Sequence, residues 1–266
     1  MQYCRFQTQD GPQYGQVVAR ADGPWVEKII APPEEDLSVR PFTGNFAPQP
    51  LAGLPLLAPV TPSKIVCIGR NYRDHAAELG NEVPPEPLLF LKAPSALLAP
   101  GGVVRLPALS KRVDYEGELG VVMARTCHKL GPNEDVRPYI RGYTIVNDVT
   151  ARDLQNSDGQ WSRAKGFDTF CPVGPIVTDE IDPDAGLPVT TRLNGGIKQH
   201  GATTDLIFNI AALLRHISAA MTLYPGDLIS TGTPAGVGPM QPGDRVEVSI
   251  AGIGTLANRV EMEEAK

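Results

Sequence analysis

The sequence predicts an α+β protein in which strands outnumber helices. Glycine occurs 27 times and proline 26 times, and both recur between short apolar segments, a pattern that favours many strands and turns over a helix bundle. At 266 residues, 42% of them hydrophobic and 20% charged, the chain can bury a sizeable core in one main domain with a small appendage.

Composition restricts the partners and the compartment. Thirty Asp and Glu residues against 24 Lys and Arg residues give a formal net charge of −6, which argues against nucleic acid or an anionic membrane surface as the main partner. No apolar run approaches the ~20 residues that a membrane-spanning helix needs, and no stretch of signal-peptide character opens the chain. The four cysteines are widely separated, so we expect reduced thiols in a soluble cytoplasmic protein rather than a zinc cluster or disulfide framework.

The first 60 residues predict a small N-terminal domain. Alternating apolar segments around 3–6 and 15–19 are separated by a turn-like Asp-Gly-Pro sequence, and no convincing catalytic group lies among them. Five prolines between 48 and 62 then stiffen a stretch that fits neither a helix interior nor a central strand. This stretch is the best linker candidate, and we expect the main domain over 63–262.

Local patterns predict the elements of the main domain. The runs that fit strands are 64–69, 228–231, 245–250 and a last run that continues through Val260. A short helix is expected over 70–80, with Gly80 as a natural stop. Apolar residues at helical spacing predict a longer helix over 205–224 that begins at a capping Asp205. We interpret this longer helix as structural.

Three carboxylates in two short motifs predict a divalent-metal site. Glu116 and Glu118 lie two residues apart, so an extended backbone points both side chains to one face, and Asp148 ends a second apolar segment. Like-charged carboxylates repel unless a cation compensates, and all-oxygen ligand sets suit magnesium, manganese or calcium rather than zinc. The alternative is the solvated face of an edge strand, but Gly117 and the apolar residues 121–123 indicate an interior strand.

His75, Glu78 and Lys165 are candidates for acid–base catalysis and for holding negative charge. His75 and Glu78 are three residues apart on the expected short helix and share a face, where the carboxylate would orient the imidazole and raise its basicity. A surface charge pair is the alternative, and it is the commoner interpretation of an isolated His-x-x-Glu. Lys165 lies between apolar and turn residues, where it is either an exposed lysine or a fixed cation for a substrate carboxylate or an enolate oxygen.

The loop 231–238 is a candidate anion-binding segment. It follows a strand-like run and offers backbone N–H groups and hydroxyls, including that of Thr233, but it lacks the Gly-Lys-Ser/Thr ending of a nucleotide-binding loop. We therefore exclude nucleotide binding. Arg70, Asn71 and Arg152 are expected either to contact substrate or to lock loops by hydrogen bonds, and both options stay open.

Five ordered motifs of the main domain form a family pattern. They are Ile68–Tyr72 followed by His75 and Glu78, Asp114–Leu119, Asn147–Asp153, Lys165–Asp168 and Thr231–Gly238. Together they resemble the fumarylacetoacetate hydrolase family over about three quarters of the chain, from Ser63 to Val260. The resemblance is strongest to the branch of acylpyruvases, oxaloacetate decarboxylases and hydroxyheptadienedioate isomerases that carries a small added N-terminal domain.

The resemblance implies a fold, an assembly and a cofactor. It implies a main domain of mixed, rolled β-sheets with few helices, a small N-terminal α+β domain, and a homodimer. It implies Mg²⁺ or Mn²⁺ held by Glu116, Glu118 and Asp148, with Ca²⁺ as an alternative occupant in crystals. It also makes the histidine–glutamate pair a catalytic dyad on a mobile lid, in agreement with the turn-forming residues 80–87.

We therefore expect a divalent-metal-dependent hydrolase of carbon–carbon bonds that acts on acylpyruvates, 2,4-dioxo acids such as fumarylpyruvate or acetylpyruvate. His75 assisted by Glu78 would activate water, Lys165 with the Thr233 loop would hold negative charge, and cleavage would release pyruvate as its enolate. Decarboxylation of oxaloacetate and isomerisation of 2-hydroxyhepta-2,4-diene-1,7-dioate use the same enolate and are alternatives. A metal-dependent dicarboxylate-binding module without catalysis is the alternative from another class.

Overall fold

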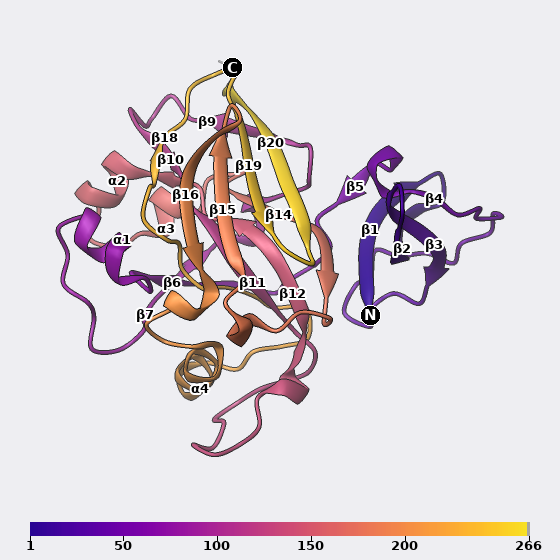
Figure 1. The fold of residues 1–266 in the computed structure, drawn as a ribbon, viewed down its shortest axis with the longest axis horizontal. Helices are drawn as coiled ribbons and strands as arrows, with labels where there is room; N and C mark the ends of the chain where they lie inside the picture. Colours follow the sequence, from indigo (N-terminus) through magenta and orange to yellow (C-terminus); the bar gives the residue numbers. More distant parts are fainter. Residues whose placement is uncertain (265–266) are drawn as a thin grey trace.

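The computed structural model describes residues 1–264, in which strands dominate and four α-helices occur. Figure 1 shows a small group of N-terminal strands at one side, joined to a larger body that contains most of the strands and the four helices. Strands pair both parallel and antiparallel in three sheets. The predicted fold class, a strand-rich α+β protein with mixed sheets, is confirmed.

The N-terminal residues form antiparallel strands that extend the largest sheet. β1, β2 and β3 pair in sequence order, and β1 continues the sheet into the larger body by pairing with β14 through Gln2 and Tyr3. The apolar segments predicted around 3–6 and 15–19 lie in β1 and β2. The strands of this part are β1 Gln2–Thr8, β2 Gly11–Arg20, β3 Gly23–Ile30, β4 Gln49–Pro50 and β5 Leu56–Leu57.

The rest of the largest sheet forms the centre of the larger body. Its strand order is β14-β12-β11-β17-β6-β7, which places β11 in the interior, paired with β12 on one side and β17 on the other. The motif with both glutamates is therefore not on an edge strand. These strands are β6 Ile65–Gly69, β7 Leu88–Lys92, β8 Leu97–Leu98, β11 Gly117–Met123, β12 Ile140–Asn147, β14 Cys171–Thr178 and β17 Leu228–Ser230.

Two smaller sheets complete the larger body. The five-stranded sheet has the order β16-β15-β19-β20-β9, and its Val189 and Val248 share one buried cluster with Leu119 and Val121 of β11. The largest sheet and the five-stranded sheet therefore enclose a common core. The remaining strands are β9 Val103–Leu106, β10 Val113–Tyr115, β13 Thr150–Ala151, β15 Pro188–Leu193, β16 Gly196–Ala202, β18 Gly238–Pro239, β19 Arg245–Ile250 and β20 Gly254–Met262.

The helices are α1 Arg73–Glu78, α2 Arg152–Ser157, α3 Ser162–Lys165 and α4 Ile210–Ala220. The predicted helix start at Asp205 is wrong, because α4 begins after Asn209, whose side chain accepts the Ala212 N–H at 2.9 Å. The backbone between Asp205 and α4 is bonded to Asn71 instead of forming a helical turn. The side-chain oxygen of Asn71 accepts the N–H of Phe208, and its backbone carbonyl accepts the N–H of residue 207. None of the helices within residues 1–264 combines the length and apolar character needed to cross a membrane.

Alternation along β11 places the two glutamates on one face. A Cβ added at Gly117 would lie 2.2 Å from Thr191 Oγ1, so position 117 faces the five-stranded sheet at a distance that only glycine permits. Leu119 follows on the same side and packs into the core. Glu116 and Glu118 consequently point to the opposite side, away from the common core.

Candidate active site

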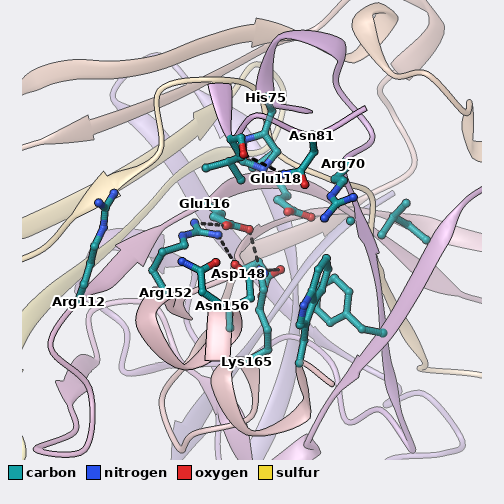
Figure 2. A pocket seen from close by; sticks show the side chains of 17 residues that line it. Arg70, His75, Asn81, Arg112, Glu116, Glu118, Asp148, Arg152, Asn156 and Lys165 are labelled. Atoms are coloured by element: carbon teal, nitrogen blue, oxygen red, sulfur yellow. Dashed lines mark hydrogen bonds and ion pairs between the residues drawn. The ribbon is translucent and has the colours of Figure 1, made fainter. Parts of the chain in front are cut away.

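Three carboxylates converge where β11 meets the segment that follows β12. Glu116, Glu118 and Asp148 offer ligand oxygens that all lie within 4.8 Å of one another, and the three side chains are buried. The backbone N–H of Asp148 donates to the Glu116 carbonyl at 2.8 Å, which joins the two motifs. Figure 2 shows the three carboxylates close together among the side chains that line one cleft.

Glu118 is the carboxylate with the least positive charge around it. Ser230 Oγ and the Gly232 N–H donate to its Oε2 at 2.6 and 2.7 Å, and both donors are neutral. Burial raises the pKa of Glu118 well above its ordinary value, and the negative charges of Asp148 and Glu116 raise it further. A cation among the three carboxylates would stabilise the charged form of Glu118.

Cationic side chains neutralise the other two carboxylates. Lys165 Nζ donates to Glu116 Oε2 at 2.8 Å and to Asp148 Oδ2 at 2.6 Å, while Arg152 pairs with Glu116 and Lys92 donates to Asp148 Oδ1 at 2.6 Å. Burial alone would raise the pKa of Glu116, but Lys165 and Arg152 hold it well below its ordinary value. Burial would lower the pKa of Lys165, yet the charges of Asp148 and Glu116 keep it above its ordinary value.

The donor set fits a hard divalent cation. The group contains carboxylate oxygens alone, and Glu118 Oε1 accepts no hydrogen bond within residues 1–264. Oxygen-only sets suit magnesium and manganese, whose binding would offset the repulsion among the three buried charges. Glu116, Glu118 and Asp148 are therefore the residues that would hold such an ion.

His75 and Glu78 both lie on α1, with His75 at the cleft. His75 Nδ1 and Glu78 Oε2 are 3.5 Å apart without a well-formed hydrogen bond, and Nδ1 is buried with no partner within residues 1–264. The Gly236 N–H instead donates to both oxygens of Glu78 at 3.1 Å. Burial lowers the pKa of His75, while the charge of Glu116 raises it and that of Arg152 lowers it. A neutral imidazole therefore faces the cleft at neutral pH.

Two of the predicted substrate contacts line the cleft. Arg70 has a φ of 56°, an uncommon conformation for a residue with a side chain, and its guanidinium lies 6.0 Å from the ring of Trp161. Thr233 also lines the cleft, and its hydroxyl donates to the Gly117 carbonyl at 2.9 Å. That bond ties the 231–238 loop to the strand of the glutamates.

Asn71 lies behind the wall of the cleft rather than along it. Its buried side-chain amide donates to the carbonyls of Thr231 and Phe208 at 2.8 and 3.1 Å and accepts the Phe208 N–H at 2.8 Å. Of the two options open from the sequence, this geometry favours loop locking over substrate contact. Arg152 is likewise held by Asp114, Glu116 and Gln155.

The cleft has a volume of about 420 Å³ and one aromatic wall. Phe90 and Trp161 meet edge to face with ring centroids 5.3 Å apart, and Lys165 Nζ lies 4.9 Å from the Phe90 ring centroid. The aromatic wall therefore lies beside the lysine that contacts Glu116 and Asp148. The polar rim residues are Asn81, Arg112, Gln155 and Asn156.

Sequence reasoning missed Lys92 and Gln199. Lys92 ends the apolar run of β7, and a lysine at that place gave a weak sign of burial. Gln199 on β16 is fully buried; its Oε1 accepts the Gly117 N–H at 2.9 Å, and its Nε2 donates to Thr233 Oγ1 at 2.7 Å and to the Pro234 carbonyl at 2.8 Å. No local pattern marked it, because its partners come from two distant segments.

The fold and this site define a strand-rich protein built around a buried group of three carboxylates that fits a divalent cation. Residues 64–261 match the family model described as fumarylacetoacetate (FAA) hydrolase C-terminal. The chain belongs to this enzyme family, so the resemblance of the five motifs is confirmed.

Similar proteins come from the predicted branch of the family. The chain is 40% identical over 256 residues to oxaloacetate tautomerase YisK of Bacillus subtilis, covering 91% of this chain and 81% of the relative. It is 38% identical over 282 residues to 2,4-didehydro-3-deoxy-L-rhamnonate hydrolase of a Sphingomonas species, covering 98% and 96%. The crystal structure of 2-hydroxyhepta-2,4-diene-1,7-dioate isomerase from Mycobacterium marinum matches with a TM-score of 0.86 at 44% identity, covering 100% of both chains.

Proposed function

We propose that this protein is a divalent-metal-dependent hydrolase of carbon–carbon bonds that acts on acylpyruvate-type 2,4-dioxo acids. The proposal includes Mg²⁺ or Mn²⁺ as the ion, a catalytic domain over 63–262 with a small domain over 1–60, and a cytoplasmic homodimer. Membership in the family and the hydrolase among the relatives support the reaction class. The four free, buried cysteines agree with a reducing compartment.

The observation that carries the proposal is the buried imidazole of His75 in the same cleft as the three carboxylates. His75 is 5% exposed, lines the same cleft as Glu116, Glu118 and Asp148, and has Glu78 within 3.5 Å. A base with a pKa lowered by burial accepts a proton from water without first losing one of its own. Hydrolysis needs such a group, whereas metal binding alone does not.

The ion held by the three carboxylates would polarise the 2-oxo and carboxylate oxygens of the substrate and lower the energy of an enolate. Lys165 keeps two of those carboxylates in position through its contacts with Glu116 and Asp148. Its fixed positive charge also favours negative charge that develops on a substrate oxygen nearby. The aromatic side chains of Phe90 and Trp161 limit water in the part of the cleft beside Lys165.

In the proposed hydrolysis, His75 both accepts the proton of the attacking water and returns it to the product. His75 takes a proton from water, and the oxygen forms a bond to the C4 carbonyl carbon of the 2,4-dioxo acid. The C3–C4 bond then breaks, its electron pair forms the enolate of pyruvate, and C4 leaves as a carboxylic acid. The protonated His75 returns its proton at C3, which gives pyruvate. Glu78 stabilises the imidazolium between these two proton transfers.

The direct test is pyruvate formation from acetylpyruvate and from fumarylpyruvate. Protein stripped with EDTA is compared with protein to which Mg²⁺ or Mn²⁺ is restored. The proposal expects turnover that depends on the ion and products in equal amounts, pyruvate and the matching acid. Ion binding without turnover of either substrate contradicts the hydrolase assignment and favours the dicarboxylate-binding module.

A second candidate is tautomerisation of oxaloacetate, which the similarity to a tautomerase favours. It needs the same enolate and a proton at C3 but no attacking water. The ultraviolet absorbance of the enol form of oxaloacetate reports this reaction, and pyruvate release reports decarboxylation. Faster loss of the enol without pyruvate, together with no cleavage of acetylpyruvate, would assign the site to tautomerisation; isomerisation of 2-hydroxyhepta-2,4-diene-1,7-dioate is followed in the same way.

A further inference from the structure

Arg112 occupies a distinct place at the rim of the cleft. It directly precedes β10, lines the cleft, and has a side chain that is 50% exposed. Figure 2 shows it at one side, with Arg152 between it and the three carboxylates. The mechanism proposed above assigns no role to Arg112.

Arg112 is held rigidly in this place. Its Nε donates to Asp114 Oδ1 at 2.9 Å and its Nη2 to Asp114 Oδ2 at 3.1 Å, so both oxygens of a buried carboxylate orient the guanidinium plane. Its carbonyl accepts the Arg152 N–H at 2.8 Å, which fixes the backbone. The third guanidinium nitrogen, Nη1, has no hydrogen-bond acceptor within residues 1–264. A pre-oriented donor is therefore available to a ligand at low entropic cost.

Arg112 shares the carboxylate of Asp114 with Arg152. Asp114 also accepts from Arg152 Nε at 2.9 Å, so one carboxylate serves two guanidinium groups. Arg152 in turn pairs with Glu116, which Lys165 already contacts. From the rim inwards, the positive charges of Arg112, Arg152 and Lys165 are thus matched by the carboxylates of Asp114, Glu116 and Asp148, and a divalent ion would add net positive charge to this part of the cleft.

Neither of the other two arginines of the cleft, within residues 1–264, combines a guanidinium held by a carboxylate with a donor nitrogen that is free. Arg152 is buried and makes hydrogen bonds to Asp114, Glu116 and Gln155, so its donors are occupied. Arg70 lies beside Trp161 in the segment that leads into α1, at another side of the cleft.

We propose that Arg112 binds the distal carboxylate of a dicarboxylic 2-oxo acid whose 2-oxo end is held at Glu116, Glu118 and Asp148. Arg112 is then the residue that makes the site prefer a dianionic substrate over a monoanionic one of equal length. This inference rests on the proposed function for the position of the 2-oxo end. It adds the substrate class, dicarboxylic acids such as fumarylpyruvate rather than acetylpyruvate.

Equilibrium binding tests the inference without turnover. Full-length protein loaded with Mg²⁺ is titrated in a calorimeter with 2-oxoheptanedioate and with 2-oxoheptanoate, which differ in having a carboxylate or a methyl group at carbon 7. The wild type is expected to bind the dicarboxylate about 10-fold or more tightly. Arg112→Gln is expected to remove this preference and to leave the affinity for 2-oxoheptanoate unchanged within about twofold.

Arg163→Gln is the matched control. Arg163 is 58% exposed and forms a two-nitrogen pair with Asp158, as Arg112 does with Asp114, but it does not line the cleft. It is expected to keep the wild-type preference. Equal weakening of both acids in Arg112→Gln would mean that Arg112 only supports Asp114, and it would overturn the inference.

Two further outcomes separate this inference from the proposed function. A wild type that binds neither acid, or binds both equally, overturns the role of Arg112. A wild type that prefers the dicarboxylate through Arg112 but cleaves no 2,4-dioxo acid supports the binding role and contradicts the hydrolase. Turnover then adds a second readout: Arg112→Gln should raise KM for fumarylpyruvate and leave KM for acetylpyruvate unchanged.

Discussion

The buried carboxylate of Asp36, in the loop between β3 and β4, and the three carboxylates of the cleft use their surroundings in opposite ways. Asp36 accepts hydrogen bonds from Arg5 Nε at 2.8 Å, Tyr14 Oη at 2.9 Å, and both the backbone N–H and the hydroxyl of Ser38. Both of its oxygens are occupied, and Asp36 is not among the residues that line the cleft. Glu118, by contrast, has neutral donors on one oxygen and faces the cleft.

The pKa values of Asp36 and Glu118 are shifted in opposite directions, as these surroundings would predict. Burial alone would raise the pKa of Asp36, but the hydrogen bonds from Ser38 and the charge of Arg5 hold it below its ordinary value. Burial and neighbouring carboxylates raise that of Glu118 well above. A buried carboxylate whose hydrogen-bond and charge partners all come from the protein stabilises the fold. A buried carboxylate without a cationic partner is suited to binding a cation.

The largest expected effect concerns the base of the cleft. His75→Ala should lower kcat/KM for acetylpyruvate by about 10²–10⁴-fold, because water loses its proton acceptor. The exposed His128, which contacts Thr222, provides the control His128→Ala with activity unchanged. Equal activity of the two variants would break the assignment of the cleft as a hydrolytic site.

Glu118→Gln should lower the affinity for Mg²⁺ or Mn²⁺ by more than about 100-fold while leaving the unfolding free energy of the ion-free protein nearly unchanged. The glutamine keeps the shape and still accepts from Ser230 and Gly232, but it cannot supply the negative charge that would hold the ion. Calorimetric titration with the ion and urea unfolding check both parts. An unchanged affinity would exclude Glu118 as a ligand.

Asp36→Ala should lower the stability of the protein and leave its activity unchanged. We expect a loss of about 3 kcal/mol in unfolding free energy, because Arg5 and Tyr14 lose the acceptor that balances them, with kcat unchanged. Urea unfolding measures the loss, and the exposed Glu34→Ala is the control, expected within about 0.5 kcal/mol of the wild type. Loss of activity in folded Asp36→Ala would mean that the N-terminal strands take part in the site.

The smallest effect is a pH dependence of stability. Because the folded pKa of Asp36 lies below its ordinary value of 3.8, its contribution to stability is fully present above that pH. It declines as the pH falls through the lower, folded pKa. The difference in urea midpoint between the wild type and Asp36→Asn should therefore be constant from neutral pH down to mildly acidic pH and shrink below it. A difference that grows on acidification would reverse the sign of the shift.

Prediction from sequence succeeded where a local rule was sufficient. Alternation along an extended strand placed Glu116 and Glu118 on one face, and three-residue helical spacing placed His75 and Glu78 on one side of α1. It failed where a local signal had a competitor, as at Asp205, whose capping chemistry serves a 3-10 turn instead of α4. Asn71 was ambiguous for the same reason, since an amide serves either a substrate or a loop.

The amino-acid order alone was sufficient for the strand-rich class, the family motifs and the identity of the three carboxylates, because these depend on periodicity and short spacing. Strand pairing decided the rest. Only the β11–β12 pair brings Asp148 to the two glutamates, and only the folded sheets bring Lys92 and Gln199 to the same site. Contacts between distant segments leave no period in the sequence, so the charge balance around the cleft emerges from the tertiary structure.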